Sequence, residues 1–556
     1  MLTRLHGGTV YDPVMGVNGK RLDLYVRDGR LVPRPAPEER IDRHFDLTGM
    51  TVMAGAIDLH THIGGGKVNI ARMMLPEDHR ADPVARGPLT RSGSGRAAPS
   101  TLTTGYRYAQ MGYTACFEPA MLPANARQAH LEMADIPILD KGAYAMLGSD
   151  DFLLRMLAAG EDQKRVNDYV GWTIQATQAL GIKVVNPGGI SAFKFNQRAL
   201  DLDEPNAHYG VTPRRVLHAL ARAVYDLGVQ HPLHVHGCNL GVPGNADTTL
   251  ATIAGMDGLP IHLTHVQFHS YGREGDRKFS SAAARIAEAV NANPAVTIDV
   301  GQIMFGQTVT ASGDTMAQYR NRAAGHPRKS VLMDIECDAG CGVVPFRYRD
   351  RNFVNALQWA IGLELFLTVA DPWRVFLTTD HPNGAPFTSY PHLIRLLMDR
   401  SFRNDVLATL NPDAARATHL GAIDRELSLY EIATMTRAAP ARLLGLADRG
   451  HLGVGAAADI TVYRPHENKE TMFSAPAFVF KDGTLVVRDG NIVEVVQGCT
   501  HTVRPEFDRG IERGLRAYYD RYHTVGWRHA RIDDDEIAAG GRGRLEIHPC
   551  QPVTSA

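Results

Sequence analysis

Cysteine is scarce in this chain, with six residues among 556. Cys337 and Cys341 form a C-x3-C pair whose spacing is neither that of a zinc finger nor that of a ferredoxin, so we expect reduced thiols. Long apolar runs are also missing, because the longest, near Trp359–Ala370, is interrupted by Glu364 and is too short to span a bilayer. The N-terminal residues lack the apolar core of a signal peptide. These absences predict a cytoplasmic protein.

An excess of charge of one sign is missing as well. The formal net charge is −1, and no basic run stands out in the sequence. We therefore expect neither nucleic acid nor a membrane among the binding partners. Hydrophobic residues make up 44% of the chain and charged residues 21%, which is typical of a globular protein with ample material for a core.

The sequence VMAGAIDLHTHIGGGK, at Val52–Lys67, combines an apolar segment with two histidines and a run of glycines. We predict one strand over Val52–Leu59. Residues i and i+2 of a strand share a face, so His60 and His62 should project together from its carboxyl end. Paired imidazoles suit a divalent ion such as zinc, and Gly64–Gly66 would let the backbone approach that ion closely. Paired histidines also occur in sheets without metal, but this context favours a metal site.

Both ends of the chain contain short alternating segments separated by Asp-Gly turns, a pattern typical of β-hairpins. One turn is Asp28–Gly29, and two more are Asp482–Gly483 and Asp489–Gly490. Neither end has enough strands to complete a stable sheet alone. We expect residues 1–53 and 441–499 to build one β-sandwich together.

Between these ends, strand-like and helix-like segments alternate, which indicates βα units around a parallel sheet. The predicted helices include Arg155–Leu180 and Pro213–Leu227. The predicted strands are Gly112–Glu118, Ala143–Leu147, Gly181–Val185, Pro232–His236, Ile261–His265, Val296–Val300, Ser330–Glu336 and Val375–Thr379. This α/β pattern favours a (β/α)8-type barrel over residues 54–440, with its active site at the C-terminal ends of the strands. Residues 500–556 are a C-terminal extension with a helix at Arg509–Tyr522 and a polar tail, which either wraps the molecule or is solvated.

Polar residues stand at several of the predicted strand ends. His234 and His236 share one face at the end of their strand, and His236 lies further toward its carboxyl end. His265 ends the next strand, and Asp380 follows the β-branched run VFLTT. Each of these residues alone would more often be a hydrogen-bonded core residue than a ligand. Their recurrence on separate strand ends favours a shared site.

Lys183 lies inside the apolar segment Gly181–Val185. A lysine in such a strand is costly unless something neutralises or pairs it. One solution is carbamylation by carbon dioxide, which turns the amine into an anion able to bridge two metal ions.

This order of side chains, an HxH pair, a lysine within a strand, two later histidines and a late aspartate, resembles the pattern of the amidohydrolase superfamily. HLGVGAAADITVY also looks like the composite β domain of that superfamily. Longer motifs resemble the A subunits of formylmethanofuran dehydrogenases and of their bacterial relatives, the formyltransferase/hydrolase complexes. They include AGAIDLHTHIGGGKVNIARMMLPED, TGYRYAQMGYT, KVVNPGG, HGCNLGVPGN, THVQFHSYG and TTDHPNGAPFTSYP. The resemblance covers nearly the whole chain.

The resemblance implies a binuclear zinc site. Its expected ligands are His60, His62, a carboxylated Lys183 (N6-carboxylysine), His236, His265 and Asp380. Asp380 would also move the proton. Two assignments stay open. His234 could replace His236, since both face the same way, and Lys194 in AFKFN could be the modified lysine. We favour Lys183 because it sits inside the strand rather than in the polar loop after it.

The implied reaction is hydrolysis of an N-formylmethanofuran-type carrier to formate and its free amine, within one-carbon metabolism and formaldehyde oxidation. The expected partners are three further subunits, B, C and D. Run backward, as in a formylmethanofuran dehydrogenase, the same site would condense formate with the carrier. Arginine heavily outnumbers lysine, which fits a GC-rich bacterial genome and favours hydrolysis. The residues also allow two different functions: a stand-alone cyclic-amide hydrolase of the dihydroorotase or hydantoinase type, and a metal-free barrel that serves assembly alone.

Overall fold

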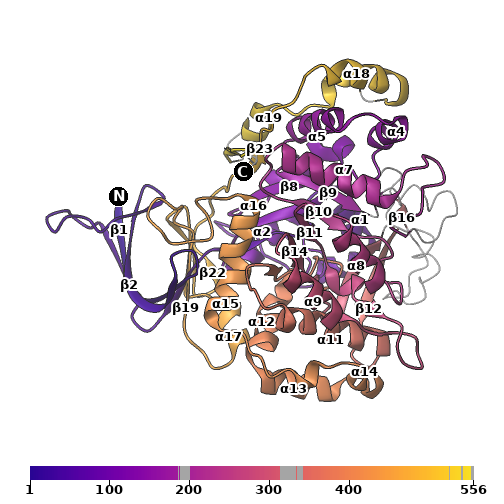
Figure 1. Cartoon of the computed structure of the whole chain (residues 1–556). Coiled ribbons are helices and arrows are strands. Elements are labelled where there is room, and N and C mark those ends of the chain that lie inside the picture. The colour runs from indigo at the N-terminus through magenta and orange to yellow at the C-terminus, as the bar shows by residue number, and fades with distance from the viewer. Residues whose placement is uncertain are drawn as a thin grey trace.

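The computed structural model describes residues 1–185, 187, 201–312, 333–334, 342–524, 526–539 and 543–551. Two large sheets organise these residues: one lies among the helices of the central body, and the other lies to its side, where the N-terminus begins (Figure 1). Among the described helices, none has both the length and the apolar character needed to cross a membrane.

The sheet of the central body contains eight parallel strands that neighbour one another in chain order. They are β6 (Ala56–Asp58), β7 (Tyr113–Met121), β8 (Asp140–Met146), β9 (Gly181–Val185), β10 (Leu233–His236), β11 (Ile261–Leu263), β14 (Val296–Asp299) and β18 (Val375–Phe376). Just beyond the ends of β6 and β18, Thr61 and His381 form an isolated parallel bridge, and the His62 N–H donates to the His381 carbonyl at 2.9 Å. The first and last strands therefore meet, and the C-terminal ends of all eight strands point to one side.

Helices connect successive strands and cover the outside of this sheet (Figure 1). They include α2 (Thr101–Gln110), α3 (Ala126–Ala134), α4 (Asp151–Ala159), α5 (Gln163–Thr177), α7 (Pro213–Asp226), α8 (Ala246–Ala254), α9 (Ala283–Ala292), α11 (Phe353–Thr368) and α12 (Tyr390–Met398). The single helix predicted over Arg155–Leu180 is wrong, because two helices occupy this region. Gly160 ends α4 with a positive φ of 75°, and the Asp162 side chain caps α5.

The second sheet has nine strands and combines both ends of the chain. The N-terminal strands are β1 (Leu2–Asp12), β2 (Val17–Arg27), β3 (Arg30–Val32), β4 (Arg43–Asp46) and β5 (Thr51–Ala54). The C-terminal strands are β19 (Ile460–Tyr463), β20 (Phe478–Lys481), β21 (Thr484–Arg488) and β22 (Asn491–Ile492). The antiparallel pair β5–β19 joins the two halves. All three predicted Asp-Gly turns connect strands of this sheet, and each of their residues has a positive φ.

The predicted strand Val52–Leu59 is in fact two strands, β5 and β6, which belong to different sheets. Gly55 lies between them and packs against Thr114 of β7. A Cβ at Gly55 would lie 2.1 Å from Thr114 Oγ1, so a side chain has no room there. This close approach lets one short segment link the two sheets.

The predicted barrel strand Ser330–Glu336 is also wrong, as far as the structure describes it. Residues Met333–Asp334 form β16, which pairs antiparallel with β17 (Gly342–Tyr348). β17 also pairs with β15 (Gly306–Ser312), so the three strands form a separate small sheet.

Residues after 499 return to the central body. β23 (Thr500–Val503) pairs parallel with the start of β8, and β24 (Leu545–His548) pairs with β23. Between them, α18 (Ile511–Tyr522) packs beside α5. After α18, Trp527 stacks on Trp172 of α5 with ring centroids 5.2 Å apart.

Candidate metal centre

His60 and His62 follow β6 and are buried, with 0% and 7% of their surface exposed. Glu118 of β7 holds His62, because its Oε1 lies 2.9 Å from His62 Nδ1. Its Oε2 accepts from the backbone N–H groups of Ile63 at 2.8 Å and Gly64 at 3.2 Å. When Nδ1 of a histidine donates to a carboxylate, the lone pair of Nε2 is available for a metal ion. Glu118 thus orients His62 and fixes the glycine loop behind it.

Asp380 follows β18 and faces both of these histidines. Its Oδ1 lies 3.0 Å from His60 Nε2 and 3.4 Å from His62 Nε2, and it accepts a hydrogen bond from Asn383 Nδ2 at 3.0 Å. The φ of Asp380 is 48°, a left-handed value that residues other than glycine adopt rarely and often at functional sites. Burial alone would raise the pKa of Asp380, but the neighbouring rings of His60, His62 and His265 hold that pKa well below its usual value.

Lys183 lies in β9 with 2% of its surface exposed. Burial, the largest effect, lowers the pKa of the Lys183 amine to about 7, although Asp380 and Asp299 act in the opposite direction. A neutral amine, unlike an ammonium, can react with carbon dioxide. Lys194, the other candidate lysine, lies outside the described residues.

His236 and His234 both point inward from β10, but at different depths. His236 lines a pocket at the C-terminal ends of the strands, together with His60, His62 and Lys183. His234 lies deeper, where its Nε2 is 3.0 Å from His60 Nδ1 and its Nδ1 is 3.0 Å from His231 Nε2. The geometry therefore favours His236 as the residue that faces a metal.

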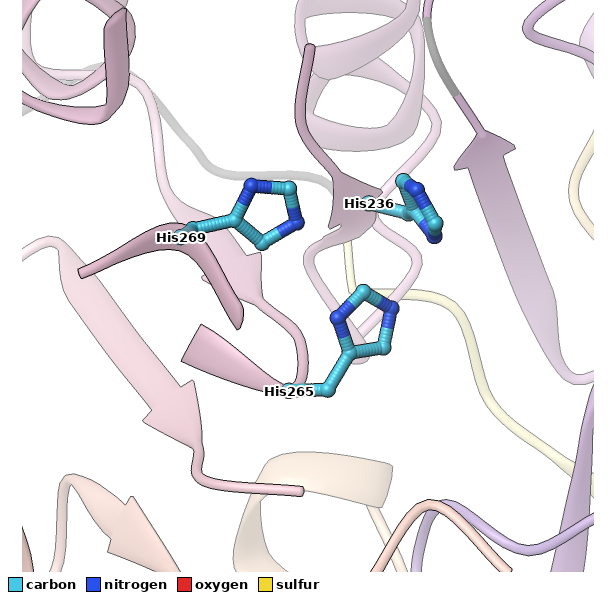
Figure 2. A group of neighbouring side chains, drawn as sticks. All are labelled: His236, His265 and His269. Atoms are coloured by element: carbon cyan, nitrogen blue, oxygen red, sulfur yellow. The ribbon is translucent and has the colours of Figure 1, made fainter. Parts of the chain in front are cut away.

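His265 follows β11 with a left-handed φ of 37°. Gly301 permits this conformation, because a Cβ there would lie 2.3 Å from His265 Cβ. Figure 2 shows the rings of His236, His265 and His269 pointing toward one space, and one nitrogen of each lies within 4.8 Å of the others. Both ring nitrogens of His269 are buried without a hydrogen-bond partner among the described residues.

All six side chains predicted as ligands line the same pocket: His60, His62, Lys183, His236, His265 and Asp380. They come from strands β6, β9, β10, β11 and β18, whose C-terminal ends are distant in sequence. The Nε2 atoms of His60 and His236 are buried and form no hydrogen bond within the described part of the chain. Such orphaned imidazole nitrogens beside a carboxylate fit the nitrogen and oxygen ligands that zinc prefers.

Sequence reasoning did not assign two carboxylates of this site, Glu118 and Asp299. Asp299 ends β14 and lies 3.0 Å from His60 Nδ1. Each stands at or near the end of a predicted strand, which is the signal that selected His265 and Asp380. Lys67, which also lines the pocket from the start of α1 (Gly66–Met74), was likewise not assigned.

The sequence model of the amidohydrolase family matches residues 43–494. The chain belongs to the amidohydrolase family. Its parallel-strand sheet with helices outside it is the fold of that family.

Two relatives match almost the full length of this amidohydrolase. The A subunit of the formyltransferase/hydrolase complex Fhc of Methylorubrum extorquens is 45% identical over 530 residues, which cover 94% of this chain and 95% of that protein. Protein FwdA of Methanocaldococcus jannaschii is 39% identical over 554 residues, which cover 96% of each chain. Among solved structures, a chain of the FhcABCD complex of M. extorquens with methylofuran superposes with a TM-score of 0.93 at 43% identity. That superposition covers 99% of this chain and all of the other.

Proposed function

We propose that this chain hydrolyses the N-formyl group of a methanofuran-type carrier, releasing formate and the free amine, as the A subunit of a formyltransferase/hydrolase complex. The observation that carries the proposal is the convergence of the six predicted ligands on one pocket. The similarity to the Fhc A subunit, together with the match to a complex that contains methylofuran, supports the carrier and the B, C and D subunits as partners. In this proposal the reaction belongs to cytoplasmic formaldehyde oxidation. We further propose that the eight parallel strands form the predicted (β/α)8 barrel and that the nine-stranded sheet belongs to the predicted composite β-sandwich.

The proposed cofactors are two zinc ions. His60, His62 and Asp380 would hold one ion, and His236 and His265 would hold the other. Burial lowers the pKa values of His236 and His265 well below the usual value, so their rings stay neutral and can donate lone pairs. When bound, such a pair supplies a hydroxide at neutral pH and polarises a carbonyl oxygen.

Lys183 is the proposed bridge between the two ions. Its neutral amine would attack carbon dioxide, forming a carbamate and releasing one proton. A free ammonium between two divalent cations would be repelled, whereas a carbamate offers each cation one oxygen. The two aspartates near Lys183 act in the opposite direction to burial, yet the pKa still falls to about 7, which supports this chemistry.

Asp380 would handle the proton of the reaction. Its Oδ1 lies beside the Nε2 atoms of His60 and His62, which is where the attacking water would be held. From this position the carboxylate could accept a proton from that water and deliver it to the departing amine nitrogen. One water is consumed, the C–N bond of the formamide breaks, and formate and the amine result. The Asn383 amide, which donates to the same oxygen, would keep the carboxylate in place.

The reverse reaction, condensation of formate with the carrier, is the second candidate function, and the similarity to FwdA supports it. We favour hydrolysis because the identity to the Fhc A subunit is higher over a similar length.

The test uses the intact complex purified through this chain. We expect formate from an N-formyl furfurylamine and no turnover of dihydroorotate. Turnover of dihydroorotate without formate release would instead identify a cyclic-amide hydrolase.

A further inference from the structure

Asp299 is a fully buried carboxylate at the end of β14 that accepts hydrogen bonds at both oxygens. Its Oδ2 lies 3.0 Å from His60 Nδ1 and 3.1 Å from His262 Nε2. Its Oδ1 accepts from the backbone N–H of His265 and from the Thr378 hydroxyl, both at 2.8 Å. This one side chain therefore touches three of the strand ends that form the pocket.

We propose that Asp299 is a positioning residue that fixes the tautomer of His60. A neutral imidazole carries its proton on one nitrogen alone, and an ionised carboxylate can only accept. His60 must therefore carry the proton on Nδ1, which leaves the Nε2 lone pair facing Asp380 in the pocket. The inference rests on the proposed function, because that lone pair is the one that would bind zinc.

A proton on His60 Nδ1 also determines which ring nitrogens of His234 and His231 donate and which accept. His234 Nε2 lies 3.0 Å from His60 Nδ1, so with the proton on His60 this nitrogen accepts. His234 then carries its own proton on Nδ1 and donates to His231 Nε2 at 3.0 Å. Because His60 Nδ1 carries the proton that faces Asp299 and His234, both 3.0 Å away, this nitrogen has no lone pair to offer a metal ion on that side. These deeper histidines form a directional hydrogen-bonded chain beneath the pocket rather than a metal site.

Replacing Asp299 by asparagine keeps every contact of this side chain but reverses the direction of its hydrogen bond with His60. The new NH2 group cannot take the Oδ1 position, because the His265 backbone N–H there can only donate. It must take the Oδ2 position and donate to His60 Nδ1 and His262 Nε2. His262 can accommodate the change, because its Nδ1 can donate to Thr297 Oγ1 at 2.9 Å. His60 is forced to carry its proton on Nε2, where it blocks the lone pair.

The test compares zinc content and zinc affinity of the native complex with those of the Asp299→Asn complex. Partners that orient metal-ligating histidines typically contribute about 10–100-fold to metal affinity. We expect the variant to lose one zinc ion per chain, or to bind that ion about 10–100-fold more weakly, while the ion at His236 and His265 stays. A folded variant that binds both ions with native affinity would overturn the proposal.

Asp58→Asn is the matched control, because Asp58 is an equally buried carboxylate just before His60. Its Oδ2 accepts from the hydroxyls of Tyr108, at 2.7 Å, and Tyr390, and its Oδ1 accepts from the His60 backbone N–H at 3.1 Å. Hydroxyls can reverse and accept from an NH2 group, so zinc binding should not change.

A native complex without zinc would contradict the proposed metal site itself, whereas native binding by Asp299→Asn contradicts this inference alone. If the variant does not fold, neutron diffraction of the native protein decides the question. A deuteron on His60 Nδ1 is expected, and a deuteron on His60 Nε2 would overturn the assignment.

Discussion

Asp380 is the residue at which proton transfer can be separated from metal binding. Asp380→Asn keeps the shape and one metal-facing oxygen but cannot accept a proton. Loss of a positioned general base typically costs ~10²–10⁴ in rate. We expect zinc content near that of the native chain, with formate release reduced by at least about 10²-fold. Zinc analysis and steady-state kinetics on the same preparation provide the measurement.

A near-native rate for Asp380→Asn would place the proton elsewhere. His381 is the neighbouring candidate for proton transfer. However, its Nδ1 accepts from the Phe387 backbone N–H at 3.2 Å, and its ring packs against the Phe387 ring in a T-shaped contact. His381→Ala should therefore affect folding stability more than turnover.

The proposed carboxylation of Lys183 can also be tested by substitution. Lys183→Ala removes the proposed bridge, so we expect loss of both zinc and activity, with partial rescue by a short added carboxylic acid. Mass spectrometry of the native chain under mild conditions, or a well-resolved structure of the active protein, should show the carboxylated side chain. An unmodified Lys183 together with a modified Lys194 would show that the wrong lysine was chosen.

The sequence was informative for the side chains predicted as ligands and much less so for the carboxylates that support them. HxH spacing, a lysine in an apolar strand and a polar residue after β-branched runs are local patterns. They led to the six predicted ligands, all of which line the pocket. Glu118 and Asp299 act through contacts with residues 56 and 239 positions away, which no local pattern reports. The choice between His234 and His236 likewise depends on how far each side chain lies below the pocket, which alternation along a strand does not reveal.

Among the elements, Gly55 marks the junction between the two sheets. Gly55→Ala would place a Cβ 2.1 Å from Thr114 Oγ1, and Thr114 is buried. Overpacking of this kind typically costs ~1–3 kcal/mol, so we expect the free energy of unfolding to fall by about that amount. Denaturant titration followed by fluorescence measures the effect.

The double variant Gly55→Ala/Thr114→Ala should recover part of the loss, because it removes the atoms that clash. Gly514→Ala is a suitable control, since Gly514 lies exposed in α18 and its nearest neighbour would be 3.9 Å from the new Cβ. Alanine is the better helix former, so this control should stabilise the chain slightly. An unchanged unfolding free energy for Gly55→Ala would contradict the steric account.

Element types were predictable from periodicity, whereas element boundaries depended on tertiary contacts. The strands Gly181–Val185 and Tyr113–Met121 follow apolar runs that periodicity identifies directly. The segment Val52–Leu59 reads as one strand because its apolar run is continuous, and only the contact with Thr114 divides it. Ser330–Glu336 also has strand character, but periodicity does not say which sheet a strand joins.

At the scale of the whole molecule, a buried ionic cluster connects the two sheets. Lys481 of β20 donates to Asp140 of β8 at 3.0 Å and to Asp459 at 3.0 and 3.1 Å, and its side chain is fully buried. Arg449 also donates to Asp140, at 2.9 Å. Burial alone would lower the pKa of Lys481, but these carboxylates raise it above its usual value, so Lys481 is charged at neutral pH.

Lys481→Met should destabilise the chain strongly, because it removes one of the two cations that pair with the buried carboxylates of Asp140 and Asp459. Removing one partner of a buried ion pair typically costs ~3–5 kcal/mol, and we expect a decrease of that order in unfolding free energy at neutral pH. The exposed pair Arg222–Asp226 gives the comparison, since Arg222→Ala should cost only ~0.3–0.5 kcal/mol. Equal decreases in unfolding free energy for the two variants would show that the buried cluster stabilises the chain no more than the Arg222–Asp226 pair does.

The most direct test of the central claim is a zinc titration of the metal-depleted complex, with formate release from an N-formyl furfurylamine followed at each addition. We expect no activity without metal, and maximal activity once the second zinc per chain binds at this site. Full formate release from a chain that holds one zinc or none would contradict the binuclear site on which the proposed function depends.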